Sequence, residues 1–332
     1  MSPPDHDAAD VVSPVWRRRL HRSAVAALAV VGLLVAVVAA DTTVLLRRSP
    51  TVAVTTPGSG DGTAYLLLAS DSRGRLTGED AKRYKDAAQA DGERADLVMV
   101  LRSPAEGAPE LLSIPRDLFV GAGSATPHRF GMALQRGPQA MVDSLCDDLG
   151  IGVDHVAVLD FTGLVDLVDA AGGVSVRTEG PIFDRHAGLY LKRGGTHRLD
   201  GHEALAWVRS RNARVQVDGQ WRRPSDFDRT RTTHAADVIG QAARGLRSPA
   251  RLQAAAWTVG PQTRRDEGLG LRGLTELALD LRYAVGHGRV RTVPVRLTHT
   301  TVPVAFPTAR TSAALEPFRT STCAGRLQPT TG

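Results

Sequence analysis

The sequence contains few cysteines and lacks the short motifs of several enzyme classes. Two cysteines, Cys146 and Cys323, are too few for a disulfide-dense miniprotein, and no CxxC pair or Cys/His cluster predicts structural zinc. The chain has no GxxxxGK[ST], HExxH or GxSxG motif, so the catalytic templates with those signatures do not apply. Aromatic residues make up only 5% of the chain and none interleave with a basic stretch, so we expect no nucleic-acid partner.

Lysine is also scarce, although the chain is basic. Its 332 residues carry a net charge of +6, and only three of the 41 basic residues are lysine, so 38 are arginine. Base composition alone can produce such a bias, and the excess of positive charge indicates anionic partners only in general terms. The 42% of hydrophobic residues with 23% charged residues excludes a wholly disordered or collagen-like chain.

A long apolar segment lies near the N-terminus. Residues Ala24–Ala40 carry no charged or strongly polar side chain and would form about 26 Å of helix, which Val44–Leu46 extends to a membrane span. The preceding arginines (Arg17, Arg18, Arg19, Arg22) favour a cytoplasmic N-terminus. We therefore expect a cytoplasmic segment at 1–22 and a transmembrane signal anchor at 23–46, with the rest outside the cytoplasm. The alternative is a cleaved signal peptide, because Val38–Ala40 resembles a cleavage site.

The extracytoplasmic part reads as one domain. Residues 47–62 are rich in Thr, Gly and Ser and predict a flexible linker, the domain follows at 63–320, and residues 321–332 form a tail. In an oxidising compartment Cys323 of this tail can pair with Cys146, and two free cysteines are the alternative.

Three short apolar runs predict buried strands at Tyr65–Ala69, Leu97–Leu101 and Glu110–Ile114, the last two joined as an antiparallel hairpin by SPAEGAP. Further strands are expected at Val156–Leu159, Val174–Val176 and Val290–Val295. Helical patterns occupy Pro138–Leu149, Leu164–Ala171, His202–Val208, Asp226–Gly240 and Leu274–Tyr283. This alternation predicts a mixed α/β (α+β) fold with a central mixed β-sheet flanked by helices.

Polar residues lie at matching ends of the first three strands. A hairpin brings the start of one strand beside the end of its partner, so Arg94 and Asp96 should lie next to Arg116 and Asp117. If the first strand runs parallel to the third, Asp71 and Arg73 join them at the same edge. One such pair is usually an ordinary surface salt bridge, but three convergent segments indicate a site.

These residues suit phosphate chemistry with a metal ion. Asp71 and Asp96 are candidate ligands for Mg²⁺ (or Mn²⁺), which prefers one or two carboxylates and bridges substrate phosphates. Guanidinium groups bind phosphate oxygens bidentately, and the candidates are Arg73, Arg94, Arg116, Arg209, Arg211 and Arg229. Asp117 either orients Arg116 or accepts a proton, and we favour orientation.

Several segments, taken in order, resemble the motifs of the LytR–CpsA–Psr proteins. They are YLLLASDSR, RADLVMV, LLSIPRDLFV, DHVAVLDFTGLVDLVDAAGGVSV, LDGHEALAWVRSRN and SDFDR, and the resemblance is strong over residues 64–245 and weaker to about 318. It implies a phosphotransferase, anchored by one helix on the outer face of the cell membrane. Such an enzyme moves a glycopolymer from a polyprenyl-pyrophosphate carrier onto peptidoglycan through a phosphodiester bond.

The resemblance also assigns residues. It implies that Asp71 and Asp96 bind the metal and that Asp117 and Asp226 support the site. The catalytic set becomes Asp71, Arg73, Arg94, Asp96, Arg116 and Asp117, with pyrophosphate held by Arg73, Arg94, Arg116, Arg209, Arg211 and Arg229. A polyprenyl groove would draw on Leu164, Val165, Leu167 and Val168, which ordinary core packing explains better.

The chain departs from the family pattern in places. Leu97 stands where the family has Thr, Asp228 replaces a Gly, Thr233 replaces a Gln, and the segment 130–133 (FGMA) replaces an Asn-Ala run. These changes concern rate and substrate choice more than reaction class. Two alternatives stay open: a pyrophosphatase that acts on the same lipid carrier, and a non-catalytic lipid-carrier or wall-binding protein.

Overall fold

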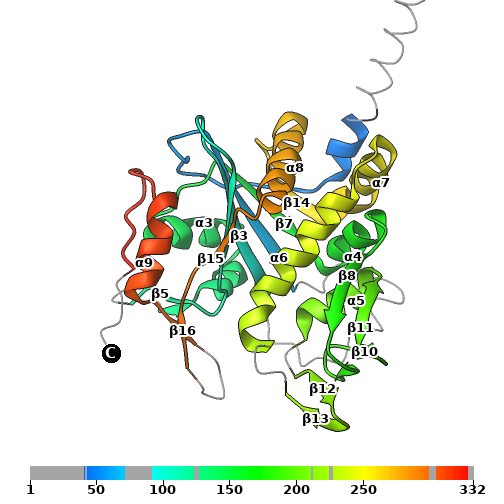
Figure 1. Ribbon diagram of the computed structural model, residues 1–332. Helices are drawn as coiled ribbons and strands as arrows, with labels where there is room; N and C mark the ends of the chain where they lie inside the picture. The colour runs from blue at the N-terminus through cyan, green and yellow to red at the C-terminus, as the bar shows by residue number, and fades with distance from the viewer. Residues whose placement is uncertain are drawn as a thin grey trace, which may run out of the picture. The chain divides into compact units, whose positions relative to one another are not determined.

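The computed structural model describes residues 41, 43–71, 92–122, 127–210, 212–223, 227–298 and 304–327 (Figure 1). The chain divides into two units, Met1–Arg47 and Arg48–Gly332. The described residues of the first unit are helical. None of the helices within the described ranges has both the length and the apolar character to cross a membrane. The predicted anchor at 23–46 falls almost entirely outside those ranges.

The second unit is built on a mixed seven-stranded sheet in the order β1-β14-β7-β2-β3-β4-β15. Its strands are β1 (Thr51–Val52), β2 (Thr63–Ser70), β3 (Ala95–Ser103), β4 (Glu110–Ile114), β7 (His155–Leu159), β14 (Thr263–Asp266) and β15 (Val290–Thr292). Strand β3 is antiparallel to both β2 and β4, whereas the pairs β2–β7, β4–β15 and β1–β14 are parallel. The predicted hairpin and mixed sheet are both present.

Both faces of the sheet are buried, which explains the continuous apolar runs of its strands. One face, with Leu66 and Val98, packs against η1 (Phe130–Arg136) and α3 (Pro138–Asp147). The other face, with Tyr65 and Met99, packs against α6 (Phe227–Gly245) and α8 (Leu271–Gly286). The sheet is therefore the middle layer of a three-layer arrangement (Figure 1).

A second core lies beside the sheet and contains α4 (Phe161–Ala170) and α5 (Gly201–Arg209). Two small sheets adjoin it: β8 (Val174–Thr178) pairs with β11 (Gly195–Leu199), and a four-stranded sheet has the order β10-β9-β12-β13. The bounds of its strands are β9 (Ile182–Asp184), β10 (Leu189–Leu191), β12 (Arg214–Val217) and β13 (Gln220–Arg222). Helix α5 begins at a capping box in which Asp200 accepts a hydrogen bond from the Glu203 amide, and it ends at Arg209.

Shorter elements complete the unit. They are β5 (Phe119–Val120), β6 (His128–Arg129), α7 (Pro249–Val259), η2 (Gly260–Gln262), β16 (Arg296–Leu297), β17 (Ala305–Phe306), α9 (Ala309–Leu315) and η3 (Glu316–Phe318). Strand β6 leads directly into η1, which places Arg129 under the edge where β3 begins and β4 ends.

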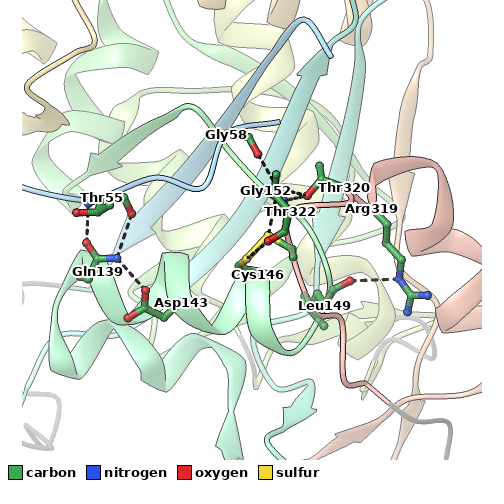
Figure 2. The surroundings of a disulfide bond; sticks show 11 residues. Thr55, Gly58, Gln139, Asp143, Cys146, Leu149, Gly152, Arg319, Thr320 and Thr322 are labelled. Atoms are coloured by element: carbon green, nitrogen blue, oxygen red, sulfur yellow. Dashed lines mark hydrogen bonds between the residues drawn. A yellow bond between two sulfur atoms is a disulfide. The ribbon is translucent and has the colours of Figure 1, made fainter. Parts of the chain in front are cut away.

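The C-terminal segment is held on α3 by a disulfide between Cys146 and Cys323 (Figure 2). Backbone hydrogen bonds flank it, from Thr320 to Gly150 at 2.9 Å and from Leu327 to Asp148 at 2.7 Å. The predicted tail at 321–332 is therefore packed onto the domain as far as residue 327.

The segment 47–62, predicted to be a flexible linker, also lies on the domain. Strand β1 pairs with β14, the Gly58 amide donates to the Val153 carbonyl at 3.1 Å, and Asp154 accepts from the amides of Ser59 and Ala64. A segment rich in Thr and Gly can form either an extended edge strand or a free linker. Contacts with residues distant in sequence, such as β14 and Asp154, decide which of the two forms.

Candidate functional site

The strand directions bring three polar segments to one edge of the sheet. Strand β2 ends at Ser70, β3 begins at Ala95 and β4 ends at Ile114. Because β3 is antiparallel to both neighbours, the segments after β2, before β3 and after β4 lie together. The Arg94 amide donates to the Asp71 carboxylate at 2.6 Å, and the Asp71 amide donates to the Arg94 carbonyl at 2.9 Å. This convergence is the one predicted from the sequence.

A chain of charged side chains continues from this edge. Arg116 forms an ion pair with Asp96, and its Nε lies 3.5 Å from an oxygen of Asp117. The other oxygen of Asp117 accepts a hydrogen bond from Nη1 of Arg129 at 3.3 Å. The Arg116 side chain is only 11% exposed, so these charges interact in a poorly hydrated environment where each Coulomb term is stronger than at the surface. Asp117 orients Arg116 and Arg129 together.

Three guanidinium-bearing residues line one cavity at this edge. Arg94, Arg116 and Arg129 surround about 50 Å³ of space together with Asp117 and Met132. A cavity with three arginines and one carboxylate favours an anionic group of several oxygen atoms. Sequence reasoning missed Arg129, and the only available signal was its position just before the segment 130–133 that departs from the family pattern.

An apolar cavity begins on the other side of Asp96. Its wall contains Leu97, Phe161 and Leu164, with further apolar residues from α5 and α6, and its polar lining consists of Asp96, Asp160 and Arg209. Asp96 therefore lines the apolar cavity while its ion-pair partner Arg116 lines the arginine cavity. The two cavities meet at this ion pair. Of the residues predicted for an apolar groove, Leu164 lines this cavity. All four pack in the second core, with Leu164, Val165 and Val168 buried and Leu167 partly buried.

Arg209 reaches the apolar cavity from the last turn of α5. Its guanidinium carbon lies 5.0 Å from the centre of the Phe161 ring, which supports it by a cation–π contact. The next residue, Ser210, donates its hydroxyl hydrogen to the buried Asp184 carboxylate at 2.7 Å, and the Asn212 amide donates to the same oxygen at 2.8 Å. Asp184 thus holds the Ser210 side chain and the Asn212 backbone.

A second charged network supports the edge from β14. Arg264 pairs with Glu93 and lies 3.5 Å from the Asp160 carboxylate, whose side chain is 2% exposed. Glu93 also accepts a hydrogen bond from the Ser70 hydroxyl. The network ties together the end of β2, the residue before Arg94 and the wall of the apolar cavity. No local sequence pattern predicts this network, because Glu93 and Arg264 are 171 positions apart.

Some predicted site residues lie outside the described residues. These are Arg73, Arg211 and Asp226, together with the side chains of Arg229, Asp228 and Thr233. Their roles stay predictions. Among the described candidates, Asp71, Arg94, Asp96, Arg116 and Asp117 are brought together, and Arg209 approaches Asp96 across the apolar cavity.

The donor atoms at the edge fit a hard divalent cation. Asp71 and Asp96 offer carboxylate oxygens from adjacent strands, the set that Mg²⁺ accepts when water and substrate phosphate complete its coordination. No group of three or more His, Cys, Asp or Glu side chains with metal-binding geometry occurs in the described part of the chain.

His234 on α6 is placed for packing rather than for catalysis. Its ring stacks on Trp207 of α5, with the ring centres 4.7 Å apart. Burial lowers the pKa of His234 from 6.5 to about 4, against a small opposing effect of Asp237. The imidazole is therefore neutral near neutral pH and joins α5, which carries Arg209, to α6.

The fold and the site together define an α/β protein with an arginine-lined anion site at one sheet edge. The model of the LytR_cpsA_psr family matches residues 37–243, and the chain belongs to this family. In solved structures, the LytR-Csp2A-Psr enzyme from Actinomyces oris aligns with a TM-score of 0.66 and 26% identity, over 83% of this chain and 97% of that one.

Two curated relatives are similar over the shared region. One is the probable cell wall biosynthesis protein LcpB of Corynebacterium glutamicum, 35% identical over 167 residues, which are 50% of this chain and 40% of LcpB. The other is the polyisoprenyl-teichoic acid–peptidoglycan teichoic acid transferase TagT of Bacillus subtilis, 35% identical over 164 residues, or 47% of this chain and 48% of TagT. The chain thus matches less than half the length of each.

Proposed function

We propose that the protein is a phosphotransferase that moves a glycopolymer from a polyprenyl-pyrophosphate carrier onto peptidoglycan through a phosphodiester bond. The observation that carries the proposal is the meeting of an apolar cavity and an arginine-lined cavity at the Asp96–Arg116 ion pair. A donor with an apolar tail and a charged pyrophosphate needs both environments side by side. The relative TagT is named a teichoic acid transferase, and its similarity to this chain supports the same class of reaction.

The proposed reaction is a substitution at the phosphorus atom that carries the glycan. A hydroxyl oxygen of the acceptor bonds to this phosphorus, and the phosphoanhydride bond to the bridging oxygen breaks. The bridging oxygen leaves with polyprenyl phosphate, and the hydroxyl proton passes to the leaving phosphate or to solvent. Positioning and charge neutralisation supply most of what such a step requires from a protein.

The residues of the edge have distinct parts in this step. Arg94, Arg116 and Arg129 hold the pyrophosphate oxygens and neutralise charge that accumulates on the leaving phosphate. Asp117 keeps two of these guanidinium groups in position, as its contacts with Arg116 and Arg129 indicate. When Mg²⁺ is bound, Asp71 and Asp96 would hold it, and it would supply further positive charge to the phosphates.

We further propose that residues 23–46 anchor the protein in the cell membrane with the catalytic domain outside the cytoplasm. The disulfide between Cys146 and Cys323 supports this placement, because disulfides persist in oxidising compartments. An anchored domain would meet its lipid-linked donor at the membrane surface.

The test is a transfer assay with the full chain in detergent, a lipid-pyrophosphate glycan, peptidoglycan and Mg²⁺. We expect covalent attachment of glycan to peptidoglycan, with a loss of about 100-fold or more in Arg116→Ala, since charge-stabilising groups typically contribute that much. Arg272→Ala is the matched control, because Arg272 is a 92% exposed surface arginine. Release of free phosphorylated glycan without attachment would instead identify a pyrophosphatase. Donor binding without any lipid product, unchanged in Asp71→Ala and Asp96→Ala, would refute both catalytic functions.

A further inference from the structure

The four-stranded sheet β10-β9-β12-β13 carries a row of aromatic and polar side chains on one face. Phe183 lies opposite Tyr190 in one strand pair and opposite Arg214 in the next, and Gln216 lies opposite Trp221 in the third. Alternation along β12 places Arg214 and Gln216 on the same side. These five residues therefore form one surface, here called the aromatic face.

The aromatic face is exposed, whereas the other side of the sheet is buried. Tyr190 is 61% exposed, Trp221 46% and Phe183 38%, while Ile182 and Leu189 pack into the second core. In a chain with only 5% aromatic residues, three of the four most exposed aromatic side chains in the described ranges lie on this face. A cluster of exposed aromatic side chains on a soluble domain often marks a binding surface.

The geometry of the face is fixed by the local sequence. Asp218 and Gly219 both have positive φ, 51° and 77°, in the two-residue turn between β12 and β13, as a tight hairpin requires. The Phe183 and Tyr190 rings meet edge to face with their centres 5.7 Å apart. The rings are thus held in place rather than free to collapse onto the surface.

The charge around the face is positive. Residues 182–193 and 214–223 contain six basic side chains and two acidic ones, and one of the acids, Asp184, is buried beneath the sheet. Of the basic residues, Arg222 lies opposite the buried Val215, on the other side of the sheet, with Glu179 at 3.8 Å. Lys192 lies 6.0 Å from the centre of the Tyr190 ring, and Arg214 stands beside Phe183. A partner that combines flat apolar surfaces with negative charge fits this pattern.

The aromatic face is joined directly to the site. Asp184, at the end of β9, accepts hydrogen bonds from Ser210 and Asn212. Ser210 directly follows Arg209 in the sequence. The sheet is therefore connected through Asp184 to Ser210, the residue that follows Arg209 of the apolar cavity. Strands β12 and β13 form the end of the unit opposite to β14 and α7 (Figure 1). The unit begins at that opposite end, where Arg48 stacks on Trp257 of α7.

We propose that the aromatic face binds the acceptor, a glycan strand whose pyranose rings carry carboxylate-bearing substituents, as peptidoglycan does. This inference rests on the function proposed above and identifies where its acceptor lies. The apolar C–H faces of pyranose rings pack on Trp221, Tyr190 and Phe183, and Arg214 and Lys192 bind the carboxylates. A lipid surface is less suitable, because β12 and β13 lie at the end of the unit opposite to α7, on which Arg48 at the start of the unit stacks (Figure 1).

Sedimentation with insoluble peptidoglycan tests the binding, with the full chain held in nanodiscs and empty nanodiscs as background. We expect Trp221→Ala and Tyr190→Ala each to weaken binding by about 2- to 12-fold, the range for one aromatic contact. Tyr283→Ala on α8 is the matched control, because this tyrosine is 42% exposed and distant from the sheet, and it should bind like the wild type. The variants remove exposed rings, so they leave no core cavity.

Two further measurements separate the possible outcomes. In the transfer assay we expect the KM for peptidoglycan to rise by the same factor, while kcat and the KM for the lipid donor stay unchanged. Flotation with phosphatidylglycerol vesicles should not distinguish Trp221→Ala from the wild type. Unchanged sedimentation, or a loss confined to vesicle binding, would refute the inference. If the wild-type chain transfers no glycan, the proposed function fails by itself, and sedimentation still decides whether this face binds peptidoglycan.

Discussion

Removal of the disulfide should destabilise the unit Arg48–Gly332 without altering its site. The double variant Cys146→Ser/Cys323→Ser keeps the hydrogen bonds of the tail, from Thr320 to Gly150 and from Leu327 to Asp148. The native structure therefore changes little. The main effect is on the unfolded chain, which gains conformational freedom when the crosslink is absent.

The magnitude follows from the length of the closed loop. Cys146 and Cys323 are 177 positions apart, which gives a loop-closure contribution of about 5 kcal/mol at 25 °C in the chain-entropy model. Measured disulfides commonly reach only part of this value, so we expect a loss of about 2–4 kcal/mol in the free energy of unfolding. For a unit of this size the loss corresponds to a decrease in Tm of about 3–7 °C.

The measurement is unfolding in guanidinium chloride, followed by circular dichroism, for the variant, the oxidised wild type and the wild type with reductant. The variant and the reduced wild type should unfold at the same denaturant concentration, below that of the oxidised protein. Transfer activity at 25 °C should be unchanged, because neither cysteine lines either cavity. A stability within about 0.5 kcal/mol of the oxidised protein would show that the crosslink does not restrict the unfolded chain as argued.

Three further predictions concern the site and its supports. Arg264→Met should lower the free energy of unfolding by about 2–4 kcal/mol in urea, because it removes a cation from the Glu93 and Asp160 carboxylates; an unchanged midpoint would contradict this. Arg129→Gln should raise the KM for the pyrophosphate donor about 10-fold, the value of one charge-assisted hydrogen bond, with Arg272→Gln unchanged in the same assay. His234 should make stability depend on pH: its folded-state pKa of about 4 lies below the usual 6.5, so the unfolded state binds the proton first. Stability should thus be full above pH 6.5 and fall by about 2–3 kcal/mol toward pH 4, a slope that His234→Gln should reduce.

Local sequence patterns sufficed for the strands that build the site. The runs at 65–69, 97–101 and 110–114 are apolar on both faces, and the SPAEGAP loop is short enough to impose a hairpin. Strand direction then places Asp71, Arg94 and Arg116 together, because a hairpin fixes which ends are neighbours. The same reasoning works wherever partners are close in sequence.

Local sequence patterns do not predict contacts between residues that are far apart in the sequence. The contact between Glu93 and Arg264 spans 171 residues, and the pairing of β1 with β14 joins segments more than 200 residues apart. No local period or turn encodes such contacts, since they depend on how the whole sheet is ordered. Arg129 was missed for a related reason: β6 has two residues, too few to show any periodicity.

The structure shows where one departure from the family pattern, Leu97, lies. Leu97, where the family has Thr, is 5% exposed and lines the apolar cavity beside Asp96. An apolar side chain there leaves the carboxylate intact and extends the apolar wall toward it. This substitution therefore affects the wall of the apolar cavity, where the donor tail is proposed to bind, rather than the set of charged groups.

The attachment of residues 51–60 to the domain limits how far the catalytic site can travel. A free linker over 47–62 would let the unit move up to about 55 Å from the end of the proposed anchor, whereas residues 47–50 alone reach at most about 14 Å. Under the proposed anchoring, the domain therefore stays close to the membrane surface. The lipid-linked donor then arrives by lateral diffusion in the membrane, while the acceptor must come within reach of a site that cannot extend into the wall to find it.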